Sequence, residues 1–132
     1  MTDGSQFLHR LDPSTLNYID HLMIQTQSGQ PVYRVNELEY VVDPVDGKGY
    51  IWGNIFQQNS IIKIDPTTGV VVKRYNMALL EDLLQFLPVE QQTPSYKGSS
   101  DRVNNVLNGI GYDPVENVFY LTGKRWHLMF KV

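Results

Sequence analysis

Two stretches of the chain repeat one six-residue pattern and decide the fold. Residues 35–40 read Val-Asn-Glu-Leu-Glu-Tyr, and residues 107–112 read Leu-Asn-Gly-Ile-Gly-Tyr. An Asp-Pro turn follows each stretch, and an aromatic-rich strand follows each turn. Sequence units that return in this way are typical of folds built from repeated small sheets. The pair therefore predicts two equivalent β units.

Outward from this pair, the chain alternates between apolar and polar residues like a series of short strands. Glycine, asparagine and glutamine lie between the strands, where hairpin turns need a permissive backbone. Asp-Pro turns at Asp12, Asp65 and Asp113 are 53 and 48 residues apart (65 − 12 and 113 − 65), although the third follows a different strand. The expected strands lie near residues 6–12, 15–24, 36–42, 49–56, 60–65, 70–76, 107–112, 117–123 and 127–132.

One segment has the spacing of a helix. Leucines at positions 79, 80, 83, 84 and 87 share one face of a helix over residues 77–87, and Pro88 ends it. Residues 91–102 form a polar loop. We expect the helix to cover an edge of the sheets, and binding of a partner is the alternative.

These elements predict an all-β chain that forms part of a β-propeller, with about two and a half blades of four-stranded antiparallel sheet. The chain then opens inside a blade, and its sheet edges are exposed and prone to aggregation. Residues 1–132 form a single incomplete domain in this interpretation. Its parts are the outer strands of one blade (1–33), a complete blade (34–76), a helix and loop insertion (77–102) and the start of the next blade (103–132).

Composition excludes several classes of function. A formal net charge of −3 offers no basic face to nucleic acid, and the absence of cysteine rules out disulfides and thiolate metal sites. His9, His21 and His127 lack the spacing of metal ligands, so we expect neither metal nor cofactor. No apolar run is long enough to cross a membrane, and the first residues do not resemble a signal peptide, so we expect a soluble chain.

An ordered set of motifs resembles glutaminyl cyclases of the plant and bacterial type, the glutamine cyclotransferases. The resemblance extends over nearly all 132 residues. Its pieces are Asp3-Gly4-Ser5, Leu11-Asp12-Pro13, Asn36-Glu37-Leu38-Glu39-Tyr40-Val41, Ile51-Trp52-Gly53-Asn54-Ile55-Phe56-Gln57, Ile62-Lys63-Ile64-Asp65-Pro66, Val106-Leu107-Asn108-Gly109-Ile110, Tyr112-Asp113-Pro114 and Leu121-Thr122-Gly123-Lys124-Arg125-Trp126.

This resemblance implies a five-bladed propeller and an acyltransferase that needs no metal. The family converts the N-terminal glutamine of a peptide into pyroglutamate and releases ammonia. Because the substrate's own α-amine attacks its γ-carboxamide, the enzyme has to fold the side chain back, move a proton and stabilise an oxyanion. The partners implied are peptides with an N-terminal glutamine, and the family is often secretory or periplasmic.

The resemblance also implies which residues bind the substrate. Asn36 matches the family's pocket asparagine, Lys124 matches its pocket lysine, and Phe56 stands where the family usually has tryptophan. His127 replaces a usual proline and is expected to reshape a turn. The acid–base glutamate of the family lies in an earlier blade, so we expect no catalytic residue in this chain and no activity from the chain alone.

Other interpretations of these residues stay open. The amides of Asn36 and Asn108 can tie one blade to the next, and Glu37 and Glu39 can be opposed by Arg34 or Lys63. Phe56 can be plain core, and Trp52 and Trp126 are expected to pack between blades. For the whole chain, the alternative to an enzyme is a non-catalytic binding or assembly module. Such a module would pair with a complementary propeller half or with another copy through its exposed edges.

Overall fold

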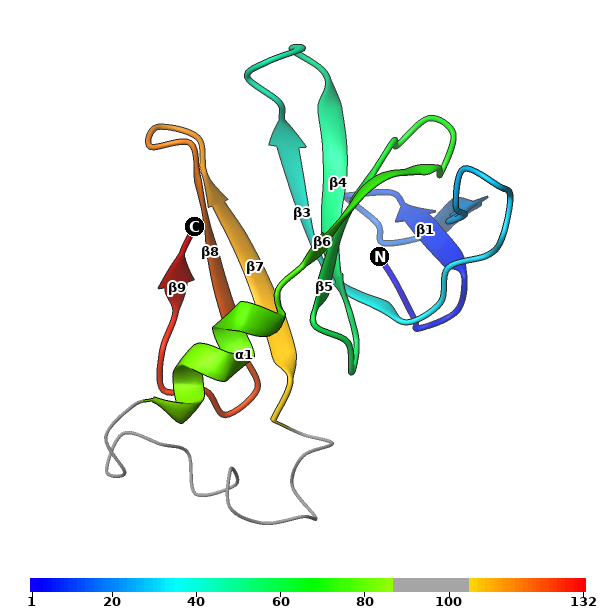
Figure 1. Cartoon of the computed structure of the whole chain (residues 1–132). Coiled ribbons are helices and arrows are strands. Elements are labelled where there is room, and N and C mark those ends of the chain that lie inside the picture. The colour runs from blue at the N-terminus through cyan, green and yellow to red at the C-terminus, as the bar shows by residue number, and fades with distance from the viewer. Residues whose placement is uncertain (87–104) are drawn as a thin grey trace.

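The computed structural model describes residues 1–86 and 105–132, which form three antiparallel sheets and one short helix (Figure 1). Strands that follow one another in sequence pair with one another in every sheet. The sheets contain β1 (Phe7–Leu11) and β2 (Tyr18–Met23); β3 (Val35–Val42), β4 (Gly49–Ile55), β5 (Ser60–Ile64) and β6 (Val71–Asn76); and β7 (Leu107–Asp113), β8 (Val118–Gly123) and β9 (Phe130–Lys131). The expectation of a mainly β chain with one helix is confirmed.

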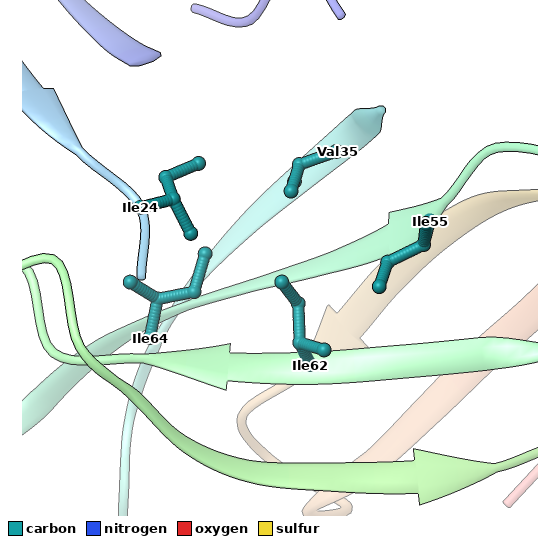
Figure 2. Close-up of a cluster of buried hydrophobic side chains, with 5 residues drawn as sticks. All are labelled: Ile24, Val35, Ile55, Ile62 and Ile64. Carbon is teal, nitrogen blue, oxygen red and sulfur yellow. The ribbon is translucent and has the colours of Figure 1, made fainter. Parts of the chain in front are cut away.

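The central sheet, β3–β6, has a hydrophobic core on both faces. On one face, Figure 2 shows five buried side chains that point toward one another: Ile24, Val35, Ile55, Ile62 and Ile64. On the other face, Ile61 joins Leu80, Leu107 and Leu121. Neighbouring residues of β5 thus serve opposite cores because side chains alternate along a strand. Each buried Ile or Leu contributes roughly 1.5–3 kcal/mol, and the two cores hold the outer sheets against the central one.

The Asp-Pro turns owe their shape to the aspartate side chain. In all four of these turns the carboxylate accepts a hydrogen bond from the backbone N–H two residues later, and the N···O distances are 2.7–2.9 Å. A short carboxylate is well suited to such a local bond, and proline pre-sets the backbone of the turn. The residues concerned are Asp12, Asp43, Asp65 and Asp113.

Two strands, β2 and β9, are each four residues shorter than expected, for local reasons. β2 begins at Tyr18 because Leu16 has a left-handed backbone with φ of 58° and belongs to the preceding turn. β9 contains only Phe130 and Lys131. The residues before β9 form a turn in which the Trp126 N–H donates to the Gly123 carbonyl, 3.2 Å away.

The helix α1 (Ala78–Gln85) lies next to the β7–β9 sheet (Figure 1). Leu80 and Leu84 are buried, and Leu80 packs with Leu107 and Leu121, whereas Leu79 and Leu83 are exposed. The expected leucine at 87 and the expected loop at 91–102 lie outside the described residues. No helix in the described part of the chain is long and apolar enough to cross a membrane.

Candidate functional site

Matching irregularities interrupt β3 and β7 near their first residues. In the central sheet the pairs are Val35 with Ile55 and then Leu38 with Gly53, so two residues of β3 oppose one residue of β4. The third sheet repeats this arrangement with Leu107 opposite Gly123 and Ile110 opposite Leu121. This two-against-one pattern is a β-bulge, a feature that re-aims side chains. The shared register confirms that residues 35–40 and 107–112 are equivalent.

The register makes Phe56 and Lys124 equivalent positions, one residue past the ends of β4 and β8. The Phe56 N–H donates to the Arg34 carbonyl at 2.8 Å, and the Lys124 N–H donates to the Val106 carbonyl at 2.9 Å. The next residue is left-handed in both places, with φ of 62° at Gln57 and 60° at Arg125. The repeated backbone therefore brings an aromatic residue and a cation to corresponding points of neighbouring sheets.

These two side chains meet across the boundary between the sheets. The Lys124 Nζ lies 4.8 Å from the centroid of the Phe56 ring. At this distance the ring's negative face attracts the ammonium group by about 0.5–1 kcal/mol at an exposed position. The contact holds an exposed cation beside an apolar wall.

Asn36 and Phe56 line the same cavity, which has a volume of about 410 Å³. The N-terminal segment closes another side of this cavity, because Thr2 Oγ1 donates to the Asn36 carbonyl at 2.7 Å. The structure thus brings all three predicted residues to one region: Asn36 and Phe56 line the cavity, and Lys124 contacts the Phe56 ring. The cavity's other lining residues, which the sequence did not suggest as site residues, are Thr2, Asp3, Gly4, Arg34, Val35 and Gln57.

Two charged residues line the cavity. Hydrogen bonds from Ser5, with a smaller contribution from His9, lower the pKa of Asp3 to about 2. An Nη atom of Arg34 donates to Gln57 Oε1 at 3.2 Å. Neither Arg34 nor Lys63 opposes the glutamates of β3 as expected, because Lys63 forms its ion pair with Asp43 instead. Because its pKa is about 2, the carboxylate of Asp3 stays ionised over the whole neutral range.

A buried asparagine performs the tie between sheets that the sequence suggested for Asn36 or Asn108. Asn54 has no exposed surface, and its Nδ2 donates to the Leu107 carbonyl at 2.9 Å. Within residues 1–86 and 105–132, the side chains of Asn36 and Asn108 make no hydrogen bond. The interpretation that Asn36 or Asn108 makes this tie was wrong, since the amide that reaches the next sheet comes from β4, opposite the bulge of β3.

The histidines do not form a metal site with other ligands in the described part of the chain. His9 and His21 are cross-strand partners, with ring centroids 6.4 Å apart. His9 Nε2 lies 3.1 Å from Asp3 Oδ2, and the Tyr18 hydroxyl lies 2.5 Å from His21 Nδ1. No group of three or more potential metal ligands occurs among the described residues.

Comparison with known proteins decides the family. The family model described as glutamine cyclotransferase matches residues 1–132. The chain belongs to this family. It is 28% identical over 131 residues to the glutaminyl-peptide cyclotransferase of Arabidopsis thaliana. It also resembles the crystal structure of glutaminyl cyclase from Myxococcus xanthus, with a TM-score of 0.77 and 28% identity.

The match covers almost all of this chain but only part of each relative. It spans 99% of this chain and 35% of the Arabidopsis protein, and 98% of this chain and 48% of the Myxococcus protein. The resemblance to glutamine cyclotransferases drawn from the sequence motifs is confirmed. The chain therefore corresponds in length to about a third to a half of these family members.

Proposed function

We propose that residues 1–132 form part of the substrate pocket of a glutaminyl-peptide cyclotransferase. The observation that carries this proposal is the contact between Lys124 and Phe56 beside the cavity lined by Asn36, in a chain that belongs to the glutamine cyclotransferase family. A cation, an amide and an apolar ring at one cavity are the groups that cyclisation of glutamine needs for binding.

In the proposed reaction the α-amine nitrogen of the N-terminal glutamine attacks its own γ-carbonyl carbon. The new C–N bond closes the five-membered ring, the bond to the amide nitrogen breaks, and a proton passes from the amine to the departing ammonia. Lys124 would stabilise negative charge on the carbonyl oxygen, and Asn36 would hold the substrate by hydrogen bonds. Phe56 would keep water away from the folded glutamine side chain.

The proton carrier is expected from outside these residues. Among the described residues, Asp3 is the carboxylate that lines the cavity. Its pKa of about 2 makes it a poor base, because a general base works best when its pKa lies near the operating pH. Asp3 therefore holds a negative charge at the cavity but cannot shuttle the proton at neutral pH.

We further propose that the three sheets are blades of a propeller. Asp12 and Asp65 open equivalent turns after β1 and β5, so β1 and β2 correspond to the outer strands β5 and β6. On this scheme, two inner strands would complete the sheet, and one of them, the equivalent of β4, would pair with the free edge of β1. That edge already accepts a strand-like partner, because Met1 and His9 exchange two backbone hydrogen bonds of 2.8 Å. Polypeptide beyond residues 1–132 would supply the two inner strands and the proton carrier.

Turnover of a peptide with an N-terminal glutamine, followed as ammonia release, tests whether the site is divided between residues 1–132 and further polypeptide. Residues 1–132 alone are expected to give no cyclisation above the buffer rate, because general acid–base catalysis contributes roughly 10²–10⁴-fold. Addition of polypeptide that completes the sheets should restore it. Clear turnover by residues 1–132 alone would contradict the proposed division.

The role of Lys124 is tested in the assembled enzyme. Lys124→Met should lower kcat/KM about 100-fold or more, since loss of one oxyanion donor costs about 10²–10³-fold. Lys131→Met is the matched control, because Lys131 lies in the same sheet and pairs with Glu116 away from the cavity. Equal activity of the two variants would remove Lys124 from the proposed pocket.

The alternative is a non-catalytic assembly module, and the free edge of β1 favours it. In the described part of the chain, this edge pairs with Met1 alone. A second copy that adds a strand there would give a defined dimer. Sedimentation at several concentrations distinguishes the two: a monomer at all concentrations contradicts self-assembly, and a dimer without cyclisation in any assembly favours the module.

A further inference from the structure

The buried side chain of Asn54 joins two bulges that belong to different sheets. Its Oδ1 accepts a hydrogen bond of 2.9 Å from the Glu37 N–H in the bulge of β3. Its Nδ2 donates a hydrogen bond of 2.9 Å to the carbonyl of Leu107, where the bulge of β7 begins. One amide thus supplies an acceptor to the bulge of β3 and a donor to the start of the bulge of β7.

Every candidate site residue is linked closely to one of these contacts. Asn36 immediately precedes Glu37, and Phe56 lies two residues after Asn54 on the same chain segment. Lys124 follows Gly123, which is paired with Leu107. The amide of Asn54 therefore lies where the segments that carry Asn36, Phe56 and Lys124 converge.

We propose that Asn54 is a positioning residue that sets the separation of Phe56 and Lys124 across the sheet boundary. Both hydrogen bonds are needed for this role. The bond to Glu37 fixes Asn54 within its own sheet, and the bond to Leu107 fixes the third sheet against it. A side chain with no exposed surface that meets both partners holds this geometry firmly. The consequence for cyclisation rests on the proposed function, whereas the geometric effect does not.

The ring of Phe56 offers a direct readout of the geometry. The Lys124 Nζ lies over the ring, 4.8 Å from its centroid, so the ring current should shift the NMR resonance of the adjoining ε-methylene protons upfield. Phe56→Leu removes the ring and defines the unshifted position. Asn54→Leu should move the resonance most of the way to that position. The matched control is Ser60→Ala, which removes a buried hydroxyl that contacts Arg74 in the same sheet.

A second variant keeps the test valid if Asn54→Leu fails to fold. Asn54→Asp retains the acceptor for Glu37, and its carboxyl can donate to the Leu107 carbonyl only while protonated. Because burial raises the pKa of a carboxyl group, the Lys124 resonance should be close to the native position in mild acid. It should move toward the unshifted position as the carboxyl ionises.

Cyclisation by the assembled enzyme distinguishes failure of this inference from failure of the proposed function. Asn54→Leu is expected to lower kcat/KM about tenfold or more, since a misplacement of about 1 Å can cost 10²-fold, while Ser60→Ala retains activity. A native Lys124 resonance in both Asn54 variants at neutral pH would overturn the positioning role. A lost ring-current shift with full activity would support positioning and contradict the catalytic use of Phe56 and Lys124.

Discussion

The β3–β4 and β7–β8 hairpins share one backbone and carry different chemistry on it. Both have a two-against-one bulge near the start of the first strand, and in both a left-handed residue follows the second strand by two positions. The side chains at most matching positions differ. The shared residues are Asn36 and Asn108, Tyr40 and Tyr112, and, on the next strand of each sheet, Lys63 and Lys131. The matched positions that differ include Glu37 and Gly109, Asn54 and Thr122, Ile55 and Gly123, and Phe56 and Lys124.

The difference teaches how a repeated fold can build an asymmetric site. Because the backbones correspond, the residues after β4 and β8 reach the same boundary from two sides. Phe56 brings an apolar face there, and Lys124 brings a charge. Had both positions kept the same residue, the boundary would hold two rings or two repelling cations. The repeat thus supplies the geometry, and divergence at matched positions supplies the chemistry.

The largest expected loss of stability comes from substitutions at the matched positions 55 and 123. Position 55 needs a large side chain, whereas position 123 has no room for one. Ile55 is 3% exposed in the core, so Ile55→Ala should cost about 2–5 kcal/mol of unfolding free energy. A Cβ on Gly123 would lie 2.2 Å from the Trp126 ring, so Gly123→Ala should cost about 1–3 kcal/mol by overpacking. Urea denaturation measures both. A neutral Gly123→Ala would show that Trp126 does not need its present place.

Positions 37 and 109 test whether the two bulges are truly interchangeable. Gly109 has φ of 127°, and a Cβ there would lie 2.7 Å from Thr122 Cγ2, so Gly109→Ala should cost about 1–3 kcal/mol. Glu37 has an ordinary negative φ, and Glu37→Gly should cost only about 0.5–1 kcal/mol through chain entropy. Comparable losses of urea stability in the two variants would contradict this difference between the bulges.

Much of this comparison could be predicted from the sequence, because its signals are local. Asp-Pro turns and alternating apolar residues located all nine strands of residues 1–86 and 105–132, and the shared pattern at 35–40 and 107–112 paired the two hairpins correctly. The leucine spacing located the helix within a few residues. Local turn chemistry explains why these elements could be found without knowledge of tertiary contacts.

The rest depended on contacts between distant residues. Asn54 reaches Leu107 across 53 positions, and no local pattern distinguishes its amide from those of Asn36 and Asn108. Asp3 and Thr2 line the cavity because the N-terminal segment crosses the start of β3. The resemblance pointed to Asn36, Phe56 and Lys124, but only the structure reveals the ring and the ammonium in contact.

The smallest expected change in stability concerns the matched lysines, Lys63 and Lys131. Their ion pairs differ in exposure to solvent. The side chains of Lys63 and Asp43 are 12% and 20% exposed, whereas those of Lys131 and Glu116 are 52% and 50% exposed. Water screens an exposed pair strongly. Asp43→Asn should therefore lower the urea midpoint at neutral pH more than Glu116→Gln. The Lys63 Nζ also lies 3.7 Å from the centroid of the Tyr50 ring, so its charge keeps one favourable contact in the Asp43 variant.

The pH dependence of the same pair gives the sharper test. The hydrogen bond from Lys63 lowers the pKa of Asp43 below its ordinary 3.8, so the unfolded chain takes up this proton at a higher pH than the native protein. The stabilisation is complete above the ordinary pKa and disappears as the pH falls through the lower native value. The advantage of the native protein over Asp43→Asn should therefore shrink from about pH 5 downward. Urea midpoints of both proteins measured across this range test it, and a constant difference would mean that the carboxylate charge of Asp43 contributes nothing.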